Sequence, residues 1–138
     1  MSNTCEVYRA EHKLCSPAWL EAIADPQTWV THVTEHRLFK SLRRDADLPN
    51  EIVTVVPAAP PQRRRACAHP TLQIIEIPPG FAPTQHTLLH EVAHLCTPAG
   101  AYHDERFAAS LVSLTRFWLG EVAARELLLA LRSTKVPL

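Results

Sequence analysis

The N-terminal part of the chain carries apolar side chains at helical spacing. One short helix is expected over residues 3–14. Asp25 and Pro26 then mark a helix start, because aspartate accepts hydrogen bonds from free backbone N–H groups and proline suits the first helical position. The helical spacing continues to about Leu42, so we expect the segment after Pro26 to be helical.

The middle of the chain has two short apolar runs, Ile52–Val56 and Leu72–Ile77, which are rich in β-branched residues and bounded by prolines. This pattern predicts two β-strands. Because proline removes a donor from a β-ladder, we expect edge strands or strand ends. Between the runs, Pro60-Pro61 and Arg63–Arg65 are typical of an exposed connection.

Helical spacing returns after the second run. We expect Thr84 to cap a helix that runs to about Cys96, where the sequence Thr-Pro-Ala-Gly ends it. Asp104 is expected to begin the next helix, and Gly120 separates this helix from a last, very apolar one over Val122–Arg132. Helices, a small sheet and further helices, in this order, predict an α+β domain.

The composition fits one compact domain over residues 1–138 and excludes several classes of protein. No stretch approaches the roughly 20 apolar residues that a membrane helix needs. Fourteen basic and fourteen acidic residues give a net charge of zero, so a nucleic-acid partner, supported only by Arg43-Arg44 and Arg63–Arg65, is the least favoured alternative. The four cysteines form no Cys-x-x-Cys pair and the N-terminus has no secretory signal, which predicts reduced thiols and a cytoplasmic location.

Two of the eight histidines belong to the motif His90-Glu91-Val92-Ala93-His94. On a helix these two histidines lie one turn apart on the same face, so both imidazoles can bind one zinc ion. The glutamate between them lies beside the metal, where it can take a proton from a zinc-bound water. The spacing therefore predicts a zinc site with His90 and His94 as ligands and Glu91 as the base.

A catalytic zinc ion usually has three protein ligands and a water molecule. His103 is the expected third ligand, because the turn after the motif can bring it back towards the metal. Asp104 and Glu105 are alternatives, since carboxylates also bind zinc. His86 lies on the same helical face, but it is about 12 Å along the axis from His94 and cannot bind the same ion. We expect His86 near the mouth of the cleft or in solvent.

The metal motif and the segment after it also resemble a known family. The pattern His90-Glu91-x-x-His94, followed after eight residues by His103-Asp104-Glu105-Arg106-Phe107, resembles the HExxH and HGxxF signature of SprT-like zinc metallopeptidases. The chain is more similar still to small, uncharacterised metallohydrolases of actinobacteria and their phages, a likeness that includes Val7-Tyr8-Arg9-Ala10-Glu11.

This resemblance implies a compact zincin-like domain in which His90, His94 and His103 bind zinc and Glu91 is the catalytic base. Asp104 stands where the SprT-like signature has glycine, and no cysteine-rich zinc ribbon follows. The DNA-linked role of SprT-like proteins is therefore not implied for this chain.

Together these residues predict a zinc-dependent hydrolase, with a peptide or protein as substrate. Glu91 would deprotonate the zinc-bound water and protonate the leaving amine. Tyr102 and Arg106 are candidates for stabilising the transition state, and Leu72–Ile77 could pair with an extended substrate, which favours a peptidase. The alternative is a metal-binding regulatory or phage–host interaction protein without hydrolytic activity.

Two further polar residues, His69 and Glu76, could line the cleft, but we expect both in solvent.

Overall fold

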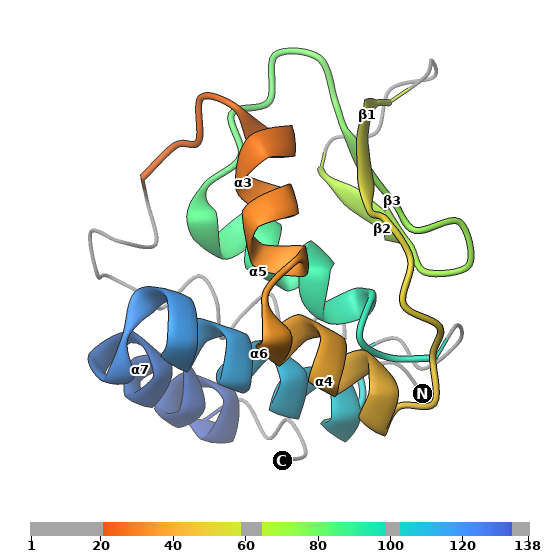
Figure 1. Ribbon diagram of the computed structural model, residues 1–138. Coiled ribbons are helices and arrows are strands. Elements are labelled where there is room, and N and C mark those ends of the chain that lie inside the picture. The colour runs from red at the N-terminus through yellow and green to blue at the C-terminus, as the bar shows by residue number, and fades with distance from the viewer. Residues whose placement is uncertain (1–20, 59–64, 99–102, 134–138) are drawn as a thin grey trace.

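The computed structural model describes residues 21–58, 65–98 and 103–133 (Figure 1). These residues form five helices and a three-stranded mixed sheet, which confirms the predicted α+β class. In chain order the elements are α3 (Pro26–Thr34), α4 (Arg37–Asp45), β1 (Thr54–Pro57), β2 (Cys67–His69), β3 (Ile74–Ile77), α5 (Gln85–His94), α6 (Glu105–Leu119) and α7 (Glu121–Ser133). The expected helix over 3–14 lies outside the described residues.

The helical segment after Asp25 starts as predicted but is two helices. The Asp25 carboxylate accepts a hydrogen bond from the Thr28 N–H at 3.2 Å, and Pro26 occupies the first turn of α3. The helix ends at Thr34, and His36 adopts an extended backbone and caps α4 by accepting from the Leu38 N–H at 3.1 Å. A side chain that caps a new helix start thus interrupts a continuous helical pattern.

The sheet has the order β1-β3-β2, with β3 parallel to β1 and antiparallel to β2. β3 is therefore the central strand, and the prediction that Leu72–Ile77 is an edge strand was wrong. The paired residues of β3 begin only at Ile74 and end at Ile77, so the prolines that bound the run lie outside the ladder and remove no donor from it. The short strand β2 was not predicted.

The helices at the C-terminal end also differ slightly from the sequence expectation. Thr84 caps α5, since its hydroxyl accepts from the Thr87 N–H at 3.1 Å, but α5 ends at His94, two residues before Cys96. Asp104 caps α6 as expected, and Gly120 separates α6 from α7 with a φ of 99°.

The core lies where the helices meet the sheet. Helix α3 contacts β1 and helix α5 contacts β2, while α6 packs between α5 and α7 (Figure 1). The central strand contributes Ile75 and the middle of α5 contributes Leu88, Leu89 and Val92, all of them fully buried. Because α5 is buried on all sides from Leu88 to Ala93, the surrounding fold fixes the position of the metal motif.

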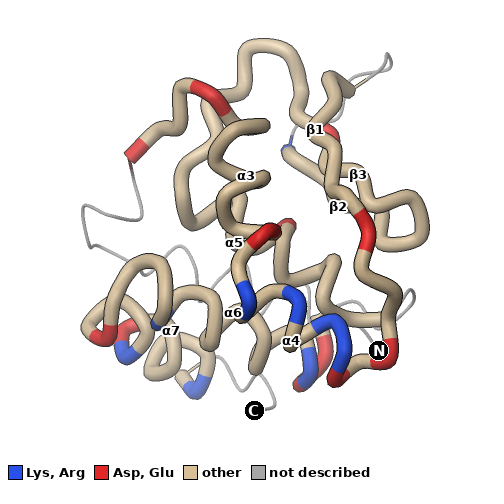
Figure 2. The backbone as a smooth tube through the Cα atoms, in the orientation of Figure 1, with Lys and Arg blue, Asp and Glu red and all other residues tan. Residues whose placement is uncertain are grey.

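The distribution of charged residues and the length of the helices bear on the expected partners. Basic residues gather on α4, with acidic residues close by (Figure 2). Arg43 is only 1 % exposed, so Arg43 and Arg44 do not form a basic patch on the surface, and the pair gives no support to a nucleic-acid site. In the described ranges no helix is both long and apolar enough to span a bilayer.

Candidate metal centre

Helix α5 carries the first two histidines of the motif. His90 and His94 lie one helical turn apart, and their ring centroids are 5.1 Å from each other. His90 is 2 % exposed, whereas His94, in the last turn, is half-buried. The helix thus directs both imidazoles to one place at the margin of the core.

His103 joins them from the residue before the cap of α6. Its Nε2 atom lies 3.0 Å from His90 Nε2 and 2.9 Å from His94 Nε2, and its side chain is 4 % exposed. Ligand nitrogens of the three residues lie within 4.8 Å of one another. The structure therefore brings together the three histidines that the sequence singled out.

The three nitrogen atoms fit a metal ion better than they fit one another. A ring nitrogen offers either one hydrogen or one lone pair, so His103 Nε2 cannot satisfy both neighbouring nitrogens through hydrogen bonds. A cation accepts all three lone pairs at once. Nitrogens at zinc-binding distance in a tetrahedral site lie about 3.4 Å apart, which is a few tenths of an ångström more than the two distances from His103 Nε2.

The alternative ligands are engaged elsewhere. Asp104 caps α6, because its Oδ1 atom accepts from the backbone N–H groups of Arg106 and Phe107, each at 3.0 Å. Its Oδ2 atom pairs with the Arg106 guanidinium at 3.1 Å, on the surface of the molecule. Glu105 is exposed. Asp104 and Glu105 are thus not part of the described cluster.

Of the two candidates for transition-state stabilisation, only Arg106 lies among the described residues, and its geometry does not support this role. The guanidinium of Arg106 is paired with Asp104, and its side chain is 60 % exposed. Tyr102 lies outside the described residues.

Glu91 is buried beside the cluster, with 5 % of its surface exposed. Its Oε1 atom accepts a hydrogen bond from the Ala68 N–H at 3.1 Å. Ala68 belongs to β2, which pairs with β3 on one side. The Ala68 N–H points to the opposite, outer side of the strand, towards α5. The outer edge of β2 therefore borders the candidate metal centre and holds the carboxylate in place.

Phe107 forms an apolar support for the histidines. Its ring centroid lies 4.9 Å from His90, 4.4 Å from His94 and 4.6 Å from His103, and the residue is fully buried. Its place in the HGxxF-like pattern is the sequence signal that could have identified it. Ala68 gave no such signal, because it contributes only a backbone group in a three-residue strand.

Two expectations about nearby residues need correction. His86 is 8 % exposed, so it is buried rather than solvated. His69 Nε2 contacts the Glu76 carboxylate across β2 and β3, and both side chains are partly buried. Cross-strand side-chain pairs stabilise a sheet, which gives His69 and Glu76 a structural role instead of full solvation.

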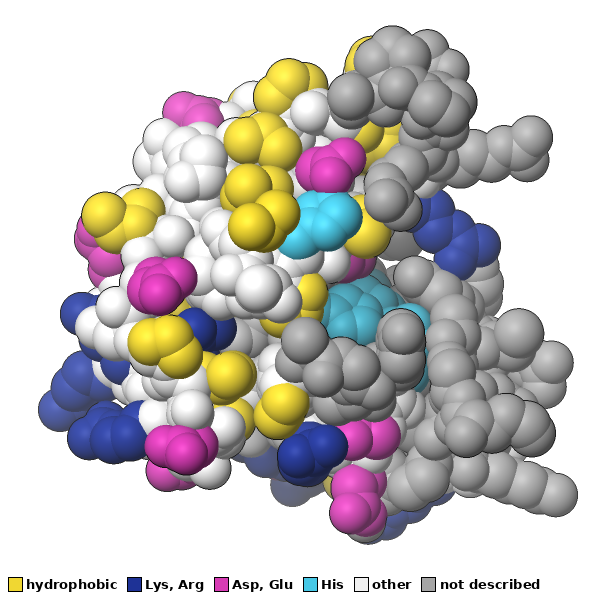
Figure 3. Space-filling model, turned by 90° about the vertical axis from the view of Figure 1, so that its right-hand side faces the viewer, with side chains coloured by type: hydrophobic (Ala, Val, Ile, Leu, Met, Phe, Trp, Pro, Cys, Tyr) yellow, Lys and Arg dark blue, Asp and Glu magenta, His cyan; other side chains and the backbone are white. Residues whose placement is uncertain are grey.

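Histidine side chains are visible from outside on one face of the molecule (Figure 3). Comparison with protein-family models, curated proteins and solved structures gives no match for this chain. The functional argument therefore rests on the arrangement of residues in this site.

Proposed function

We propose that the protein is a zinc-dependent hydrolase, and most specifically a metallopeptidase. The observation that carries this proposal is the convergence of three histidine Nε2 atoms beside a buried glutamate. His90, His94 and His103 would hold the ion. A bound zinc ion would supply Lewis-acid activation of a water molecule and of the scissile carbonyl.

The presence of Glu91 favours a catalytic metal site over a purely structural one. A structural zinc site usually fills all four positions with protein ligands and needs no base. Here the Ala68 N–H binds Glu91 Oε1 and orients the carboxylate, which would take the proton of the attacking water and pass it to the leaving amine. The hydrogen bond orients the carboxylate without protonating it.

The position of the outer edge of β2 is an argument for a peptide as the substrate. The earlier expectation placed the substrate on Leu72–Ile77, but β3 is paired on both sides. β2 has one neighbour within the described sheet and reaches Glu91 through Ala68. An extended peptide that lies along this edge would pass close to the metal centre, although the Ala68 N–H itself is bound to Glu91 and would not pair with it.

The decisive variant is Glu91→Gln, which keeps the shape of the side chain but removes the base. We expect it to retain one zinc ion per chain and to lose at least about 100-fold in hydrolysis of a fluorescent peptide library, the typical contribution of a general base. Glu105→Gln, which removes an exposed carboxylate close to the site in sequence, is the matched control and should keep both properties.

Full activity of Glu91→Gln would contradict the mechanism. Zinc binding without hydrolysis by the wild-type protein would instead favour a metal-binding protein with a regulatory or interaction role.

A further inference from the structure

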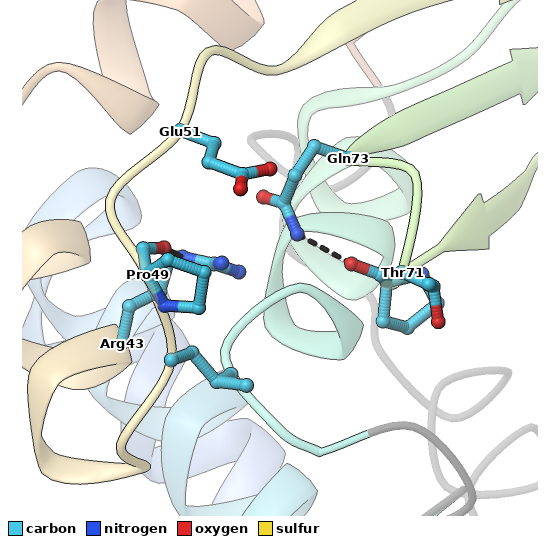
Figure 4. A pocket seen from close by; sticks show the side chains of 7 residues that line it. Arg43, Pro49, Glu51, Thr71 and Gln73 are labelled. Carbon is cyan, nitrogen blue, oxygen red and sulfur yellow. Dashed lines mark hydrogen bonds between the residues drawn. The ribbon is translucent and has the colours of Figure 1, made fainter.

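A pocket with apolar and polar walls lies between α4, the segment that follows it and the turn from β2 to β3 (Figure 4). Its volume is about 270 Å³, slightly below the range of pockets for drug-sized ligands. The three histidines of the metal centre do not line it. Its polar walls are Arg43, Glu51 and Gln73, and its apolar walls are Leu48, Pro49 and Pro70.

Arg43 places a buried positive charge at this pocket. The residue is 1 % exposed, and its guanidinium donates from Nε to the Pro49 carbonyl at 2.8 Å and from Nη1 to the Leu95 carbonyl. A guanidinium has five N–H groups, so three remain. No carboxylate of the described residues forms a salt bridge with it, and Figure 4 shows it pointing into the pocket. Such a group is suited to bind a carboxylate ligand.

Gln73 places an acceptor on the opposite wall. The residue is 3 % exposed, and its Nε2 group donates to the Pro70 carbonyl, which fixes the orientation of the amide. Its Oε1 atom has no hydrogen-bond partner among the described residues. The backbone of Gln73 has a φ of 56°, which is unusual for a residue other than glycine.

Glu51 completes the polar wall. In Figure 4 its carboxylate and the Gln73 amide oxygen point towards each other, although both are acceptors. A donor between them would satisfy both groups. Because Glu51 is exposed at the pocket, its side chain can rotate to admit such a donor.

We propose that this pocket binds a free α-amino acid with an apolar side chain. Its carboxylate would contact Arg43, its ammonium group would lie between Glu51 and Gln73, and its side chain would face Leu48 and the prolines. A simple anion would be repelled by Glu51 and a simple cation by Arg43, whereas a zwitterion matches both charges. The proposal does not depend on the metal centre.

Calorimetric titration of the wild-type protein with L-leucine, N-acetyl-L-leucine and L-leucinamide tests both charged contacts separately. N-acetyl-L-leucine lacks the ammonium group and L-leucinamide lacks the carboxylate. We expect leucine to bind and each analogue to bind at least about tenfold more weakly, since each loses a charge-assisted hydrogen bond. No binding of leucine at millimolar concentration, or equal binding of either analogue, would overturn the proposal.

Two variants test the residues themselves. Glu51→Gln and Gln73→Leu should each weaken leucine binding at least about tenfold, whereas Glu35→Gln, which removes another exposed carboxylate, should leave it unchanged. Circular dichroism reports whether each variant is folded. Should Gln73→Leu fail to fold, Glu51→Gln still decides, because its side chain is exposed; unchanged affinity in that variant contradicts the site.

Discussion

The histidine nitrogens are the most informative atoms of the molecule. His90 and His94 share a face of α5 through helix geometry alone, but His103 reaches them only because the chain reverses before α6. A shared cation would account for a buried imidazole in contact with two others. The identity of the third ligand is therefore the sharpest question at the scale of residues.

We predict that His103→Ala weakens zinc binding by at least about 100-fold, since even the loss of an outer partner of a ligand costs 10- to 100-fold in affinity. Competition with a chromophoric chelator measures this affinity. Asp104→Asn is the matched control, because asparagine preserves the cap of α6 while removing the rival carboxylate. Tight zinc binding by His103→Ala, combined with loss in Asp104→Asn, would transfer the ligand role to Asp104.

Cys96 provides an independent test of burial. Its thiol is 2 % exposed, and burial raises its pKa to about 12. Since the thiolate is the reactive form, we expect iodoacetamide at pH 8 to modify the half-buried Cys67 in the native protein and to spare Cys96, as read by peptide mass spectrometry. Alkylation of both at equal rates would show that Cys96 is accessible.

The same shift has a consequence for stability. The pKa of Cys96 is higher in the folded chain than the usual value of 9.0, so the unfolded chain loses this proton first. The contribution of the thiol to stability is therefore complete below pH 9 and decreases as the pH rises towards 12. Cys96→Ala should show a smaller decrease across this range in denaturant titrations.

At the scale of elements, Arg43 joins α4 to the end of α5. Its guanidinium binds the carbonyl of Leu95, the residue that follows His94 and caps the helix. A cation at this position also complements the negative end of the helix dipole. Helix α5, which carries His90 and His94, is thus held at its start by Thr84 and at its end by Arg43.

We predict that Arg43→Met lowers the free energy of unfolding by about 3 kcal/mol, because the buried Leu95 carbonyl and the partly buried Pro49 carbonyl lose a charged donor. The adjacent and exposed Arg44 supplies the control, since Arg44→Met should change stability by less than about 0.5 kcal/mol. Urea denaturation followed by circular dichroism measures both. Equal stability of the two variants would contradict the structural role of Arg43.

The elements that could be predicted from the sequence are those with local causes. Asp25, Thr84 and Asp104 cap helices through hydrogen bonds to residues two or three positions away, so each start is visible in the sequence. β2 was missed because three residues are too few for a periodic pattern, and the break at His36 because histidine is an uncommon cap.

The part of the candidate site that could not be predicted depends on tertiary structure. The contact between Ala68 and Glu91 joins residues 23 positions apart, and it forms only once β2 lies against α5. The buried position of His86 is also determined by neighbouring elements and not by its own helical spacing. Side chains in a motif could be identified, whereas backbone groups that orient them could not.

At the scale of the whole molecule, the site links the helices to the sheet. The three histidines come from α5 and the start of α6, and Glu91 is tied to the sheet through β2. A metal ion bound only by the folded chain stabilises that chain. Hydrolysis and folding stability should therefore respond together to the metal.

The most direct test of the proposed zinc-dependent hydrolase activity is to measure hydrolysis of the fluorescent peptide library by the wild-type protein before and after metal removal. We predict that dialysis against 1,10-phenanthroline abolishes hydrolysis and that one equivalent of zinc per chain restores it. Hydrolysis that persists in the metal-free protein would contradict the account.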